Sequence, residues 1–165
     1  MGEIEEKKFN ILAQDILNHE QVLKMKTFIQ HGSITTYDHC LNVAKQAYHL
    51  AKKYKMNVDE ESLVKACLLH DFYLYDWHLA SISVPLFKMH GFTHPEKACE
   101  KAIEYFKVDD KIQNCILAHM WPLTISKVPK SKEAWLLCLT DKAVALKETV
   151  FLRWRFQVAL FTLQY

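Results

Sequence analysis

The chain has 165 residues, enough for one domain with a hydrophobic core, and 50% of them are hydrophobic while 24% are charged. The formal net charge is only +2 and residues of opposite charge are interspersed, which argues against a nucleic-acid polymer or a membrane as partner. Glycine (3) and proline (4) are scarce and strongly alternating strand-like runs are absent. We therefore expect an all-α fold, a single-domain helical bundle of about six helices.

The five cysteines are widely spaced and form no C-x-x-C pair, which is typical of buried thiols in a reducing compartment. The first residues are charged rather than apolar, unlike a secretory signal. No apolar run approaches the roughly 18 residues that cross a bilayer. These observations predict a cytoplasmic protein.

Apolar residues recur at helical spacing in three stretches of the first half of the chain. The expected helices cover about residues 9–30, a second segment that ends near residue 55, and a third segment that ends at the adjacent pair His70–Asp71. A break at residues 31–33, with Gly32 suited to a helix C-terminus, separates the first two. The residues expected to cap the second and third helices are Ser33 or Thr35, and Asn57 or Asp59.

Three more helices are expected in the second half, after a loop over about residues 79–93. Their expected starts are His94–Pro95, Asp109 and a position near Ser131. The first start rests on the tolerance of proline at the first helical position. The second of these helices should end near His119. The apolar tail at about 149–165 is expected to continue the last helix and to pack on the body or on another subunit.

Candidate metal ligands lie beside the apolar faces of several expected helices. An imidazole and a carboxylate buried side by side, as at His70–Asp71, are costly unless a cation lies between them, and a divalent metal accepts both nitrogen and oxygen ligands. Ligands on separate helices converge inside a helical bundle. The six candidates are His39, His70, Asp71, His94, His119 and Asp141.

These candidates also have purely structural interpretations. The pair His70–Asp71 could be hydrogen bonded at a helix end, His94 could be an N-cap before Pro95, and His119 could be a polar helix terminus. We favour the metal site, because His39 and Asp141 complete an ordered set with the pair.

That order, His39 then His70–Asp71 then Asp141, resembles the H…HD…D signature of the HD-domain superfamily of metal-dependent phosphohydrolases. The motifs that carry the resemblance are residues 37–44 (YDHCLNVA), 66–71 (ACLLHD) and 137–142 (LCLTDK). The resemblance covers about residues 33–146. It implies one domain over 1–165, with this HD-like core between an N-terminal helix at about 9–30 and the tail.

The resemblance also implies the ligand set. A first divalent ion would be held by His39, His70, Asp71 and Asp141. A second would be held by His94 and His119, with Asp71 bridging the two. Imidazole and carboxylate ligands suit Fe, Mn, Co, Ni or Zn, so we expect one or two transition-metal ions.

The expected activity is hydrolysis of a phosphate ester or anhydride of a small metabolite or nucleotide by metal-activated water. Asp71 and Lys142 are the expected catalytic residues, with Lys142 neutralising a phosphate oxygen or orienting Asp141. Lys88 and His90, in the expected loop, are further candidates for substrate contact.

Two other functions remain open at this point: a catalytically silent HD-fold module that binds a nucleotide or regulates, and a di-iron oxygenase of HD fold. All six ligand positions are filled, which argues against the silent module. The substrate stays unassigned, because pocket specificity depends on loop side chains. Assembly as a homodimer is also left open.

Overall fold

The computed structural model describes the backbone of residues 2–76 and 90–162, and the side chains of residues 2–76 and 91–150. The prediction of an all-α protein is confirmed, since helices dominate the described chain and its sheet structure is limited to one small hairpin. The helices are α1 (Glu3–Leu17), α2 (Glu20–Leu23), the 3-10 helix η1 (Lys24–Thr27), α3 (Thr36–Lys53), α4 (Glu60–Leu69), α6 (His90–Phe106), α7 (Asp110–Ala118) and α8 (Lys132–Thr162). The hairpin consists of β1 (Ile29–His31) and β2 (Ile34–Thr35).

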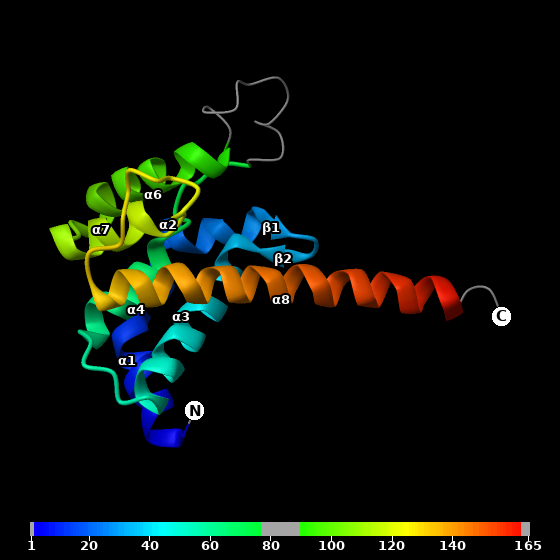
Figure 1. Ribbon diagram of the computed structural model, residues 1–165, viewed down its shortest axis with the longest axis horizontal. Coiled ribbons are helices and arrows are strands. Elements are labelled where there is room, and N and C mark those ends of the chain that lie inside the picture. The colour runs from blue at the N-terminus through cyan, green and yellow to red at the C-terminus, as the bar shows by residue number, and fades with distance from the viewer. Residues whose placement is uncertain (1, 77–89, 163–165) are drawn as a thin grey trace.

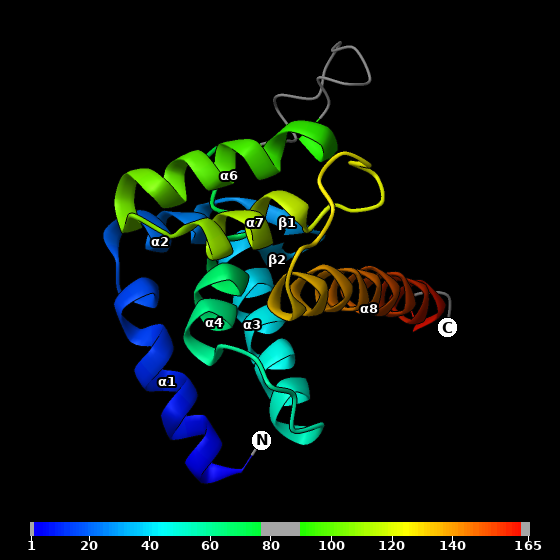
Figure 2. The ribbon, with the colours of Figure 1, turned by 60° about the vertical axis from the view of Figure 1, so that its left-hand side comes forward.

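Helix α4 lies at the centre of the fold. It packs against α1, α3, α6, α7 and α8, and Figure 2 shows it between α1 and α3. Nearly all of its side chains are buried, including the serine at position 62, as is typical of a helix surrounded by protein. The chain leaves α4 at His70, so the pair His70–Asp71 emerges inside the bundle.

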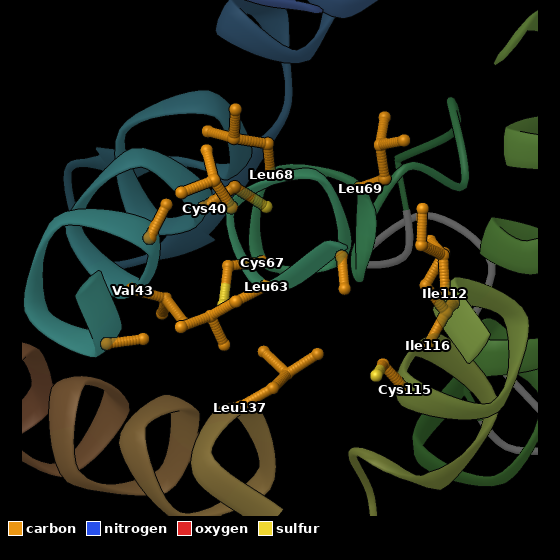
Figure 3. Packing of buried hydrophobic residues seen from close by; sticks show 14 of the residues in the cluster. Cys40, Val43, Leu63, Cys67, Leu68, Leu69, Ile112, Cys115, Ile116 and Leu137 are labelled. Atoms are coloured by element: carbon orange, nitrogen blue, oxygen red, sulfur yellow. The ribbon is translucent and has the colours of Figure 1, made fainter. Parts of the chain in front are cut away.

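The hydrophobic core fills the space around α4. Figure 3 shows Leu63 and Cys67 of α4 next to Val43 of α3 and Leu137 of α8. On the other side, Leu69 faces α7. Because α3, α4, α7 and α8 share this core, their inner faces are held at fixed positions relative to one another.

Side-chain caps fix where three of these helices begin. Thr35, Asp59 and Asp109 each accept the backbone N–H of the residue three positions later, which confirms the caps predicted at these positions. Asp59 is further held by its own N–H, which donates to Glu133 of α8 at 2.7 Å.

The predicted helix over residues 9–30 is wrong. Helix α1 ends at Leu17, and α2, η1 and the strand β1 follow it. A new helix starts at His19, whose ring accepts the N–H of Gln21. Gly32, with a φ of 58°, occupies the two-residue hairpin loop rather than a helix end, because such loops favour a left-handed residue. The apolar spacing over these residues does not mark one buried face, since Phe9 and Ile16 are buried but Leu23 is 39% exposed.

The predicted helix start at His94–Pro95 is also wrong. Helix α6 extends from His90, so Pro95 lies inside the helix and His94 is not an N-cap. Pro95 lacks the N–H that would bond to the carbonyl of Gly91. The predicted loop is therefore helical over residues 90–93, and the remainder of that prediction, 79–89, lies outside the described residues.

Helix α8 contains 31 residues and continues through position 162, as expected for the first part of the tail, while the packing of the tail stays a prediction. Figure 1 shows α8 crossing the body and extending beyond the rest of the described chain. Among the described helices, none combines the length and the hydropathy that crossing a bilayer requires.

Candidate metal centre

The structure brings all six predicted side chains into one buried cluster. His39 comes from α3, the pair His70–Asp71 from the end of α4, and Asp141 from α8. His94 comes from α6 and His119 from the end of α7. All of them are at most 8% exposed, so the cluster lies in the interior where the helices meet.

Four of these residues form the first group, around the Nε2 atoms of His39 and His70. His39 Nε2 lies 3.1 Å from Asp141 Oδ1 and 4.0 Å from Asp71 Oδ2. His70 Nε2 lies 3.5 Å from Asp71 Oδ2 and 3.6 Å from Asp141 Oδ1. Two imidazole nitrogens thus face two carboxylate oxygens.

The second group forms around the other oxygen of Asp71. Its Oδ1 lies 3.2 Å from His94 Nε2 and 3.6 Å from His119 Nε2, and these two nitrogens are 2.8 Å apart. Asp71 therefore presents one oxygen to each group.

Hydrogen bonds on the far side of three rings fix which nitrogen faces the cluster. The Nδ1 atoms of His70 and His119 lie 2.8 and 2.6 Å from the carbonyl oxygens of Cys67 and Ile116. His39 Nδ1 lies 2.8 Å from Glu148 Oε2. These oxygens only accept, so Nδ1 carries the hydrogen and, in the neutral ring, Nε2 keeps its lone pair. Metal-ligating histidines are oriented in this way.

Lone pairs and carboxylate oxygens that converge in a buried space need a positive partner. Within the described chain, His70 Nε2 and Asp71 Oδ1 have no hydrogen-bond partner, although both atoms are buried. Nitrogen and oxygen donors of this kind suit a divalent transition metal. The residues present could therefore bind such an ion.

Electrostatics keeps the carboxylates ionised. Burial raises the pKa of Asp71, but the neighbouring His70, His94 and His119 outweigh it and hold that pKa well below its usual value. At Asp141, burial raises the pKa, but the hydrogen bond with His39 and the nearby imidazole of His70 outweigh burial and lower it. Two ionised carboxylates next to each other attract a cation.

The imidazoles differ among themselves. Burial lowers the pKa of His39, but hydrogen bonds to Asp141 and Glu148 outweigh burial and raise it to about 10. Burial, together with His94 and His70, lowers the pKa of His119 to about 3, so that ring stays neutral. A metal ion in the first group would consequently compete with a proton on His39.

Sequence reasoning missed three polar residues around the cluster. Glu148 is hydrogen bonded to His39, and Gln30 Nε2 donates to Asp71 Oδ2 at 2.7 Å. The ring of His31 lies edge-on to the ring of His39, with their centroids 5.5 Å apart. Glu148 follows Asp141 by seven residues, so both lie on one face of a helix, and this spacing could have indicated it. Gln30 and His31 gave no such signal.

The structure places Lys142 differently from expectation. Its ammonium donates to the carbonyl of His119 at 2.7 Å and to the carbonyl and sulfur of Cys138, both at 3.3 Å. Lys142 therefore ties α8 to the end of α7 instead of contacting Asp141. Lys88 and the side chain of His90 lie outside the described residues, so their substrate contacts stay predictions.

The family model for the HD domain matches residues 36–146, about two thirds of the chain, and the protein belongs to the HD domain family. The match contains all six ligand candidates and ends five residues after the last of them, Asp141. Neither the curated proteins nor the solved structures yielded a match.

Proposed function

We propose that this HD domain protein is a metal-dependent phosphohydrolase that cleaves a phosphate ester or anhydride of a small metabolite or nucleotide. The observation that carries the proposal is the position of Asp71, which turns one oxygen to each of two buried donor groups. Two-ion sites with a shared carboxylate suit phosphate chemistry, since both the attacking and the leaving oxygen need stabilisation.

In this proposal one ion is held by His39, His70, Asp71 and Asp141. The other is held by Asp71, His94 and His119. When bound, such ions bring the pKa of a water toward about 7 and neutralise charge on the phosphate oxygens.

The protein's own side chains prepare the site for that chemistry. The low pKa values of Asp71 and Asp141 keep both carboxylates available as ligands at neutral pH. Glu148 and the carbonyl groups behind His70 and His119 hold the rings, so little reorganisation is needed on binding. Burial keeps bulk water from competing with these contacts.

An exposed lysine on the helix that carries His94 is a candidate contact for a phosphorylated substrate. Lys97 lies one turn after His94 on α6, and its ammonium lies 4.4 Å from the ring centroid of Tyr75. Burial and the charge of Asp71 raise the pKa of Tyr75 to about 12, so its phenol remains a hydrogen-bond donor. In the proposal, Lys97 and Tyr75 contact a phosphate oxygen, and Lys88 and His90 are further candidates for the same role.

Metal analysis of purified protein tests the proposal together with a screen of phosphate esters and anhydrides. We expect about two transition-metal ions in the wild type and about one in the His94→Ala/His119→Ala variant. His49→Ala, which removes a histidine of α3 outside the cluster, serves as the control and should keep both ions. Hydrolysis should be lost in Asp71→Asn.

Three results would contradict the proposal. Wild-type protein that binds no metal after reloading would remove its basis. A nucleotide that raises thermal stability without being cleaved would indicate a binding module. Consumption of dioxygen, without release of phosphate, would indicate an oxygenase.

A further inference from the structure

The β-hairpin contains an irregularity next to the metal centre. Ile29 pairs with Thr35 and His31 pairs with Ile34, so three residues of β1 face two residues of β2. Gln30 is the extra residue. Such a bulge turns a side chain away from the regular alternation of a strand, and bulges occur frequently beside active sites.

The bulged Gln30 is directed into the interior. It is 8% exposed, and its Nε2 donates to Asp71 Oδ2 at 2.7 Å. The hairpin packs on α3 and α8, two helices that also supply ligand candidates. The hairpin, which the sequence did not reveal, therefore places a polar group on the carboxylate shared by both donor groups.

The orientation of the Gln30 amide is fixed by its other contacts. The hydroxyl of Tyr73 donates to Gln30 Oε1 at 2.5 Å, and Thr36 Oγ1 lies 3.2 Å from the same oxygen. Because the amide oxygen receives these donors, the amide nitrogen must face Asp71. Tyr73 and Thr36 are themselves buried, so solvent does not compete.

This hydrogen bond restricts rotation of the Asp71 carboxylate. Oδ2 is held toward Gln30 and the first group, while Oδ1 is left without a hydrogen-bond partner in the described chain and faces His94 and His119. A carboxylate free to rotate could offer both oxygens to one ion. Held by Gln30, it offers one oxygen to each.

We propose that Gln30 is a positioning residue that sets the bridging geometry of Asp71 and thereby the affinity of the second metal ion. This inference rests on the proposed two-ion centre. The oxygen that accepts the amide hydrogen serves the first ion, and the second ion depends on the oxygen that Gln30 keeps turned toward His94 and His119. Tyr73 acts one step further away, by holding the amide.

Stepwise Mn²⁺ binding, followed by electron paramagnetic resonance, tests the proposal. Gln30→Met keeps the length of the side chain but removes the donor, and Tyr73→Phe removes only the hydroxyl that holds the amide. We expect the second Mn²⁺ to bind Gln30→Met about 10- to 100-fold more weakly than wild type, with little change for the first ion. The exchange-coupled signal of an ion pair should be lost at Mn²⁺ concentrations that produce it in wild type. Tyr73→Phe should show a smaller change in the same direction.

The matched control is Gln113→Met, a change on α7 away from the cluster. It removes a side-chain amide that donates to the carbonyl of Val108 at 2.9 Å. It should bind both ions as wild type does. The proposal is overturned if Gln30→Met and Tyr73→Phe both keep wild-type second-ion affinity and coupling, or if both ions weaken equally. Wild-type protein without any Mn²⁺ binding would overturn the proposed function as well, whereas two ions in every variant would overturn the role of Gln30 alone.

Discussion

Glu148 is hydrogen bonded to His39 Nδ1, the ring nitrogen that faces away from the cluster. Replacing Glu148 should lower the affinity of the cluster for a metal ion, by an amount that depends on the replacement. Its Oε2 accepts the Nδ1–H of His39 at 2.8 Å, and its Oε1 accepts from Asn42 at 3.0 Å. Glu148→Gln keeps an acceptor for the ring but removes the charge, whereas Glu148→Ala removes the acceptor. Stability without metal and affinity for the first ion should both fall in the order wild type, Gln, Ala.

Glu148→Ala should lower both the stability of the metal-free protein and its affinity for the first ion, by similar free energies. His39 is 0% exposed, and a buried hydrogen bond that involves a charged group contributes about 1.5–3 kcal/mol. Loss of the partner of a ligating imidazole weakens metal binding by about 10- to 100-fold, equivalent to about 1.4–2.8 kcal/mol. We therefore expect Glu148→Ala to bind the first ion about 10- to 100-fold more weakly than wild type, with the affinity of Glu148→Gln between the two.

Competition with a colorimetric chelator for Zn²⁺ measures the affinity, and urea unfolding in excess chelator measures the stability. Glu104→Gln is the control, because Glu104 is an exposed carboxylate that pairs only with Lys101 among the ion pairs of the described chain. Glu148 does not support His39 in this way if Glu148→Ala binds Zn²⁺ and unfolds as wild type does, or if Glu148→Gln loses as much affinity and stability as Glu148→Ala.

Three further changes have defined outcomes. The pKa of His39 is raised to about 10, so in excess chelator its protonation contributes stability that is fully present below the unfolded pKa of 6.5. This stability is lost as the pH rises through 10. The urea midpoint should therefore fall over this pH window, and less steeply in Glu148→Gln. Asp59→Ala should lower the free energy of unfolding by about 1 kcal/mol through loss of the α4 cap, while Asp59→Asn should retain most of it, as thermal unfolding can show. Lys142→Met removes the hydrogen bond to the His119 carbonyl and should lower the free energy of unfolding by about 1 kcal/mol. The KM for a phosphorylated substrate should stay unchanged. A raised KM in steady-state assays would instead support a substrate contact.

The ordered ligands could be predicted because their order and local motifs resemble the HD signature and each lies beside apolar residues of its own segment. His70–Asp71 ends α4, the most apolar of the helices that carry them. The caps at Asp59 and Asp109 were predictable because the side chain acts on a backbone group only three residues away.

The hairpin could not be predicted, because its strands have three and two residues, too few to show an alternating pattern. Gln30 reaches Asp71 only through the bulge, a contact between residues 41 positions apart. The start of α6 was predicted wrongly because a proline near a helix start is usually at the first helical position. In this fold, Pro95 lies inside the helix, which begins at His90.

Helix α8 carries both Asp141 and Glu148 and continues without interruption to Thr162. With a rise of about 1.5 Å per residue, its 31 residues span about 46 Å, and Figure 1 shows that its far end extends beyond the body. The ligand candidate Asp141 and the support of His39, Glu148, therefore belong to one continuous helix, and a displacement of α8 would move both relative to His39 on α3.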